Sequence, residues 1–332
     1  MQQSTNHLES SLGRRRLAWT RYWAEGGLHS LGTSFAGNYA DSMGTFWQGQ
    51  FALCDPTQHI LDIGCGNGPL AKLLIDLDPD KGPSWTGIDL ANPSPLWLAQ
   101  QTEVVQSRLH FRGGVLAEEL PFADQSFDLV VSQFGIEYSD LSRSQAEVVR
   151  VLKPKGRIAL LVHHAQSLPV IVSRHEMRHL DFLDRLEFMS ITEQMIPFMA
   201  KLAEADGQKA LLNDRAAMET RKRFDEAQAA IERRAATEPI PDLLADVRIY
   251  AQECFQLAVS AGPQAASKRL ATYIAFLQDS RFRLDELVRS ALDEVGVISL
   301  QERFATLRQQ PARSSLTPLV VNDHVFGWAI SA

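Results

Sequence analysis

The chain has 332 residues, 45% of them hydrophobic and 22% charged, and its 40 acidic against 33 basic side chains give a net charge of −7. This length can bury a large core and suits one large domain or two smaller ones. The negative balance provides no field that would hold a polyphosphate, so nucleic acid is not expected as a partner.

Cysteine usage and hydropathy predict a cytoplasmic protein. Cys54, Cys65 and Cys254 are widely spaced and form no C-x-x-C pair, which is typical of a reducing compartment and not of a disulfide framework. The first 16 residues lack the apolar core of a secretory signal, and no apolar run reaches 18 residues. We therefore expect no membrane association.

The N-terminal region, residues 1–55, is rich in aromatic side chains. Eight of them fall within residues 19–51, together with several glycines. This composition predicts an aromatic-rich helical lid over a binding site, and ordinary packing of an N-terminal helix is the alternative. The residues concerned include Trp19, Tyr22, Trp23, Tyr39, Phe46 and Trp47.

The next region, residues 56–165, alternates short apolar runs with amphipathic ones. Strands are predicted at 59–64, 84–90, 108–113, 127–133 and 156–163, with helices between them. Buried strands separated by helices indicate an α/β fold with a doubly wound parallel sheet.

Residues 166–282 change to one amphipathic helix after another, interrupted at Gly207, at Pro239–Pro241 and at Gly262–Pro263. The remaining residues, 283–332, return to the first pattern. Residues 285–307 predict a helix, a stop at Gly296 and a strand, and the run from His324 to the end predicts another strand. The helical region is therefore predicted to be an insertion into one sheet, as a substrate cap or a dimerisation surface.

A glycine-rich loop follows the first predicted strand in the stretch "ILDIGCGNGPLAKLL". Glycines let the backbone pass close under a ligand and leave free N–H groups where the next helix begins. The nicotinamide fingerprint G-x-G-x-x-G would place its third glycine at position 69, which is Pro69. The spacing here is instead G-x-G-x-G, with Asp62 two residues before Gly64.

Four motifs in order give this chain a family resemblance: "LDIGCGNG", "GIDL", "LPFADQSFDLVVSQ" and "RVLKPKGRIAL". Residues 59–163 resemble the class I S-adenosylmethionine-dependent methyltransferases, in particular those of ubiquinone and menaquinone biosynthesis. The resemblance implies a Rossmann-like, mostly parallel seven-stranded sheet, and the terminal "VFGWAISA" fits its antiparallel last strand. It also implies S-adenosylmethionine as the cofactor.

The resemblance assigns roles to individual residues. Asp62 would orient the loop or attract the cofactor's ammonium group, and Asp89 would accept the two ribose hydroxyls. Leu90 would support the adenine face, and Gln133 with Phe134 would face the methyl donor. The loop residues implied to pack on the cofactor are Gly64, Cys65, Gly66 and Gly68.

One position departs from the family pattern. Before the Leu of "LPF" the family commonly carries Gly-Asp, whose Asp recognises the adenine amino group, whereas this chain has Val115 and Leu116. Either the backbone of Ala117 makes the adenine contact, beside Leu116, or Glu118 does so from a shifted loop.

Methyl transfer from a sulfonium requires alignment of an acceptor and, for a hydroxyl or an acidic carbon, a base. Candidate catalytic residues are Glu137, Tyr138, His163 and His164, at the ends of two strands. The sequence "SQFGIEY" lacks the Asn/Asp-Pro-Pro-aromatic motif of base-amine methyltransferases, which favours O- or C-methylation of a small molecule. The alternatives are a protein side chain as acceptor, or a non-catalytic cofactor-binding protein, and a homodimer is possible in each case.

Residues 175–179, "HEMRH", match the H-E-x-x-H spelling of zinc metalloproteases, in which two His share one helix face. A chance match is a material risk in a chain with nine His, and no third ligand stands in a recognisable extension. The sequence therefore predicts no metal site, with His175 and His179 on a helix face near the start of the insertion.

Overall fold

The computed structural model describes residues 2–30, 37–79, 81–309 and 315–332. The chain folds into two compact units. Unit 1 comprises Met1–Ile171 and Glu286–Ala332, and unit 2 comprises Val172–Asp285. Each unit has its own core and is described by itself.

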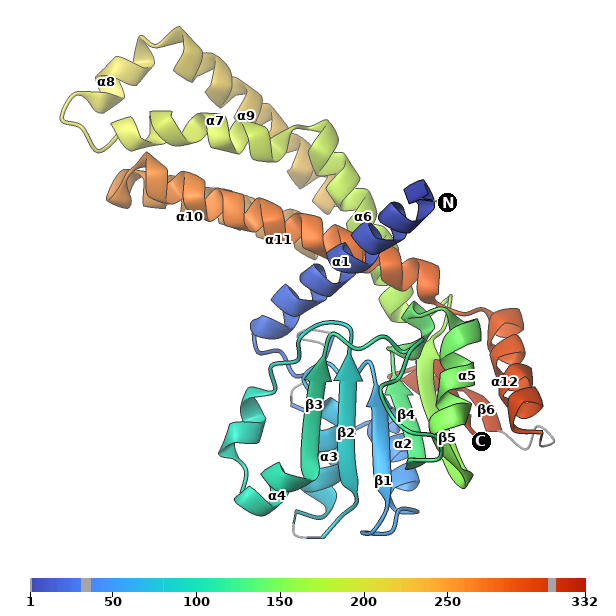
Figure 1. Ribbon diagram of the computed structural model, residues 1–332. Coiled ribbons are helices and arrows are strands. Elements are labelled where there is room, and N and C mark those ends of the chain that lie inside the picture. Colours follow the sequence, from blue (N-terminus) through green and yellow to red (C-terminus); the bar gives the residue numbers. More distant parts are fainter. Residues whose placement is uncertain (1, 31–36, 80, 310–314) are drawn as a thin grey trace. The chain divides into compact units, whose positions relative to one another are not determined.

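Unit 1 is built on a seven-stranded sheet with the order β3-β2-β1-β4-β5-β7-β6 (Figure 1). The first five strands run parallel, and β7 pairs antiparallel with both β5 and β6. The mostly parallel sheet with an antiparallel end is confirmed. The strands are β1 His59–Ile63, β2 Ser84–Asp89, β3 Leu109–Gly113, β4 Phe127–Gln133, β5 Leu152–His163, β6 Ser315–Val321 and β7 His324–Ser331.

Helices cover both faces of this sheet, as the alternation of strand side chains requires. Ile60 packs in a core with Trp47 and Leu70, whereas its neighbour Leu61 packs in a second core with Val148. The helices of unit 1 are α1 Gln2–Ala24, α2 Ser42–Phe51, α3 Pro69–Leu77, α4 Glu103–Arg108, α5 Leu141–Val151 and α12 Glu294–Arg308, with 3₁₀ turns η2 Leu96–Gln100 and η3 Ile136–Tyr138.

The strand predicted after Gly296 is wrong, because these residues belong to α12. Asp293 caps that helix by accepting a hydrogen bond from the N–H of Gly296 (2.8 Å). Val297, Leu300 and Phe304 follow at helical spacing and are buried in the second core. The cap and the three- and four-residue spacing of the buried apolar residues favour a helix. They outweigh the low helix propensity of Gly296 and of the β-branched residues beside it.

Unit 2 is helical and has a core of its own. Its helices are α7 Phe188–Lys201, α8 Gly207–Leu212, α9 Arg215–Ala235 and α10 Asp242–Ala261, with most of α6 Leu168–Arg185 and α11 Pro263–Ser290. Gly262 ends α10 with φ 88°, and Gly207 begins α8. None of the helices in the described part of the chain combines the length and the apolar character needed to cross a bilayer.

Candidate functional site

The glycine loop lies where the connections of the sheet change direction. β1 and β4 are neighbours, β2 and β3 lie to one side of them, and β5, β7 and β6 lie to the other. Ligands of open α/β sheets bind in the crevice at the carboxyl ends of the strands at such a point. Gly64, Gly66 and Gly68 have φ values of 71°, 48° and 74°, in the left-handed region that favours glycine.

The surroundings of these glycines leave no room for side chains. A Cβ on Gly66 would stand 2.5 Å from the ring of Trp23, and one on Gly68 would stand 2.6 Å from the ring of Phe111. The α1 helix is thus in direct contact with the loop through Trp23. The glycines therefore allow both the positive φ values of the turn and this close packing.

Asp89, at the end of β2, ties the loop to the sheet. Its Oδ2 accepts a hydrogen bond from the N–H of Gly66 (2.9 Å), and its Oδ1 accepts one from the N–H of Ala91 (2.8 Å). Burial raises the pKa of Asp89 to about 6, although these two N–H groups oppose the shift. Each oxygen keeps a lone pair for a further donor.

Asp62 lies in β1 and is almost completely buried. Burial, and then the charge of Asp89, raises the pKa of Asp62 well above its ordinary value. Within the described residues its Oδ2 has no hydrogen-bond partner. A buried carboxyl with an unmatched oxygen is unusual in a folded protein.

A hollow opens at this edge of the sheet, within unit 1. Of the predicted cofactor-binding and catalytic residues, ten line it: Gly64, Cys65, Asp89, Leu90, Leu116, Ala117, Glu118, Gln133, Phe134 and Tyr138. The other lining residues include Arg15, Trp19, Trp23, His29, Tyr39 and Val115. Asp62, Gly66, Gly68, Glu137, His163 and His164 do not line it.

Part of the chain is similar to known methyltransferases. Residues 61–160 match a family model described as a methyltransferase domain. A phthiotriol/phenolphthiotriol dimycocerosates methyltransferase of Mycobacterium leprae is 39% identical over 104 residues, 31% of this chain and 36% of that protein. The ubiquinone/menaquinone biosynthesis C-methyltransferase UbiE of Geotalea daltonii is 34% identical over 132 residues, 39% of this chain and 54% of that protein.

Residues 61–160 are therefore similar to a methyltransferase domain. The chain spans about a third to a half of the length of the curated relatives it matches. Among solved structures, the YcgJ protein of Bacillus subtilis is 28% identical, with 44% of this chain and 58% of that chain covered and a TM-score of 0.29.

The turn after β4 is strained. Phe134 has φ 52°, an uncommon value for a residue with a side chain, and such strain concentrates at functional sites. Its N–H donates to the carbonyl of Leu161 (2.7 Å), and its ring stacks on His163 with the centroids 4.2 Å apart. Beside it, Gln133 Oε1 accepts a hydrogen bond from Trp47 Nε1, which holds its amide against α2.

Three of the four predicted catalytic residues lie in one network. Oε1 of the buried Glu137 accepts a hydrogen bond from the N–H of His163 (2.9 Å), and burial raises the pKa of Glu137 to about 7. Burial lowers the pKa of His163 to about 3, so its ring is neutral. The ring of Tyr138 meets that of His163 edge to face, with centroids 6.2 Å apart. Tyr138 lines the hollow, and the other two stand behind its wall.

His164 is separate from this network. Its ring stacks on Trp328 (centroids 4.5 Å apart), and its Nδ1 accepts a hydrogen bond from the N–H of Gln166 (2.9 Å). These contacts account for the side chain structurally and place it outside the hollow's lining.

The wall where the sequence departs from the family pattern is formed by Val115, Leu116, Ala117 and Glu118. Oε1 of Glu118 accepts a hydrogen bond from the N–H of Asp140 (2.7 Å), which holds this carboxylate to the start of α5. Either assignment of the adenine contact, to the Ala117 backbone or to Glu118, stays a prediction.

Asn67, in the glycine loop beside the hollow, has a positioning role that sequence reasoning missed. It is buried, and its Nδ2 donates to the carbonyls of Trp23 (3.0 Å) and Gly27 (2.7 Å). Its Oδ1 accepts from the N–H of Ser94 (2.7 Å). Asn67 therefore joins the end of α1, the glycine loop and the segment after β2. The sequence did offer a signal, because Asn67 stands among the three glycines of the loop. An amide side chain can both donate and accept hydrogen bonds, and Asn67 does both here.

Arg15 was also missed. Its Nη1 donates to the carbonyl of Tyr138 (2.7 Å), and its Nε donates to Glu286 Oε1 (2.6 Å). This arginine fastens α1 to η3 and to the end of α11 across the hollow it lines. The basic run Arg14–Arg16 gave no indication of such a partner.

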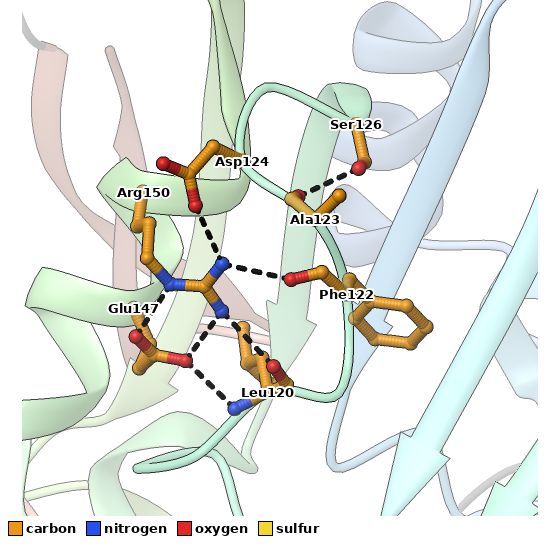
Figure 2. Close-up of polar contacts among 7 residues, drawn as sticks. All are labelled: Leu120, Phe122, Ala123, Asp124, Ser126, Glu147 and Arg150. Atoms are coloured by element: carbon orange, nitrogen blue, oxygen red, sulfur yellow. Dashed lines mark hydrogen bonds and ion pairs between the residues drawn. The ribbon is translucent and has the colours of Figure 1, made fainter.

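The loop that leads into β4 is held by a second arginine, as Figure 2 shows. Arg150 donates to the carbonyls of Leu120 (2.9 Å) and Phe122 (2.7 Å) and pairs with Glu147 and Asp124. Glu147 Oε2 accepts in turn from the N–H of Leu120 (2.8 Å). Arg150 thus fixes the loop just after the wall formed by residues 115–118, by contacts that a lysine cannot reproduce.

Proposed function

We propose that the chain transfers a methyl group from S-adenosylmethionine to a small-molecule acceptor, at oxygen or carbon, by in-line displacement. The observation that carries the proposal is the position of the hollow. It opens at the switch point of a methyltransferase domain, between the glycine loop, Asp89 and Phe134.

The residues present fit this cofactor. The hollow is lined mainly by apolar and aromatic side chains with a few polar groups, as small-molecule sites are. Asp89 has lone pairs left for the ribose hydroxyls. Asp62 lies in β1, two residues before the glycine loop. When bound, the cofactor supplies a methyl group already activated by a sulfonium charge.

The acceptor side is the part of the hollow lined by Trp19, Tyr138 and Arg15. Trp19 stacks against Trp23 (centroids 5.8 Å apart) and meets Tyr138 edge to face (6.1 Å). An aromatic wall of this kind excludes water and holds an acceptor about 3 Å from the methyl carbon, which is the main requirement of the reaction. We propose that α1 is the lid and that the acceptor is partly apolar.

Tyr138 is the proposed residue in contact with the acceptor, and Glu137 and His163 position it from behind. Glu137, with a pKa of about 7, can hold a proton near neutrality. The curated relatives are named for quinone biosynthesis and for phthiotriol dimycocerosates, which also supports a small, partly apolar acceptor.

Calorimetric titration with S-adenosylmethionine, followed by methylation assays with quinols, phenols and lipid alcohols, tests the proposal. Asp89→Ala should abolish cofactor binding, whereas Asp76→Ala, on the exposed face of α3, should leave it unchanged. Binding without turnover on any acceptor class would favour the non-catalytic alternative. Equal binding by both variants would contradict the cofactor site.

A further inference from the structure

The H-E-x-x-H stretch acquires a third potential metal ligand in the folded chain. His175 and His179 lie one turn apart in α6, and Glu238 lies in the connection between α9 and α10. One ligand atom from each of the three lies within 4.8 Å of the others. All three residues belong to unit 2.

The distance between His175 Nδ1 and Glu238 Oε2 suits two ligands of one metal ion better than a direct hydrogen bond. His175 Nδ1 is buried and makes no hydrogen bond with the described residues, although Glu238 Oε2 lies 3.4 Å away. Two ligands of tetrahedral Zn²⁺, each about 2.0–2.2 Å from the ion, are about 3.3–3.5 Å apart. A buried nitrogen left without a hydrogen bond at this distance calls for an explanation.

The tautomer of His179 is fixed by its surroundings. Its Nε2 lies 2.9 Å from the carbonyl oxygen of Ile240, and a carbonyl only accepts, so Nε2 carries the proton. Nδ1 therefore has a free electron pair, and it accepts from Arg234 Nε at 3.3 Å. Metal-binding His residues commonly donate their other ring N–H to such a carbonyl.

Arg234 would compete with a metal ion for the electron pair of His179 Nδ1. However, its Nη2 also pairs with Glu238 Oε1 (3.0 Å), and its guanidinium lies over the ring of Phe182 (4.6 Å). A metal bound to Glu238 Oε2 would leave both of these contacts in place. Only the 3.3 Å contact with His179 would have to be given up.

We propose that His175, His179 and Glu238 form a zinc site that ties α6 to the α9–α10 connection, with a water as the fourth ligand. Three protein ligands and a water are also the ligand set of catalytic zinc, and what separates this site from a zinc hydrolase is the position of Glu176. The carboxyl of Glu176 is not part of the cluster, and it lies near Asp242 and Asp246, whose charges, after burial, raise its pKa. The fold thus supplies the third ligand that the sequence lacked.

The test is a calorimetric titration of the chelator-treated full chain with Zn²⁺, alongside the visible absorption of Co²⁺. One ion per chain is expected, with a Co²⁺ spectrum of tetrahedral intensity. His175→Ala and Glu238→Gln should each weaken binding by at least about 100-fold, more than outer partners of a metal typically contribute. The matched control is His324→Ala, an exposed histidine of unit 1.

The helical circular dichroism signal establishes that the variants are folded. The ¹⁵N chemical shifts of the wild-type histidines give a second, independent measure of metal binding. Nδ1 of His175 and of His179 should shift on Zn²⁺ addition. No stoichiometric uptake by the wild type, uptake unchanged in both variants, or unshifted Nδ1 signals would overturn the proposal. In that case Arg234, which pairs with Glu238 and donates to His179, is the cation that these residues bind.

Discussion

Gly64 and Gly135 pack backbone against backbone where β1 and β4 end. A Cβ on Gly64 would lie 2.7 Å from the Cα of Gly135, and a Cβ on Gly135 would lie 2.7 Å from the carbonyl oxygen of Ile63. Both contacts are with backbone, which cannot give way as a flexible side chain does. The two glycines therefore set how closely the two sides of the crevice approach.

Gly64→Ala should destabilise the protein by about 2 kcal/mol or more, because it adds this clash to a φ of 71°. Urea unfolding measures the change. Gly49→Ala is the matched control, because it lies within α2 and, apart from the nearby backbone of that helix, no described atom lies within 4 Å of the new Cβ. That variant should gain up to about 1 kcal/mol. Equal effects would contradict the close-packing argument.

Cofactor binding should depend on pH through Asp89. With a pKa of about 6, this carboxyl is ionised at pH 7.5 and increasingly protonated below pH 6. Since the proposed ribose contact uses the carboxylate, affinity should fall by up to about tenfold per pH unit below pH 6. Asp89→Asn should bind weakly at every pH in the same calorimetric titration. A flat wild-type profile would contradict the assignment.

Ionisation of the buried Glu137 carboxyl should lower the free energy of unfolding as the pH rises. Burial raises its pKa from 4.5 to about 7, so between these values the folded state binds more protons than the unfolded state. The stabilisation is complete below pH 4.5 and is lost as the pH passes 7, a change of about 3 kcal/mol. Unfolding at pH 5 and pH 8 without ligand should show a smaller pH dependence in Glu137→Gln than in the wild type.

Removal of Asn67 should release the end of α1. Asn67→Ala leaves the carbonyls of Trp23 and Gly27 without their side-chain donor and should cost about 1–3 kcal/mol. Hydrogen exchange should rise in residues 20–27 and at the N–H of Ser94, while the strand amides of β4 stay protected. Unchanged exchange at these positions would show that Trp23 packing alone holds the segment.

Arg150→Lys should loosen the loop before β4, since one ammonium cannot replace contacts with two carbonyls and two carboxylates. The expected loss of stability is about 1–3 kcal/mol, measured by thermal unfolding. Arg143→Lys, on the exposed face of α5, is the control and should change stability by less than about 0.5 kcal/mol.

The parallel strands and the glycine loop could be predicted because their signals are local. A run such as "HILDIG" reports a strand buried on both faces, and three glycines at alternate positions report a turn that needs positive φ. The position of Asp89 followed from the same pattern, because it ends the second strand. The strand predicted after Gly296 failed because a cap at Asp293, ahead of the apolar run, decided for a helix.

The sequence by itself thus determined the five parallel strands, the last strand, the loop and ten of the residues that line the hollow. The tertiary structure decided which side chains meet: Trp23 on Gly66, Arg15 on the Tyr138 carbonyl, and Glu238 beside His175. Periodicity along a chain records which face of an element is buried, but it carries no information about its partner. Contacts between residues far apart in sequence depend on the packing of whole elements, which fixes the partner only when the chain is folded.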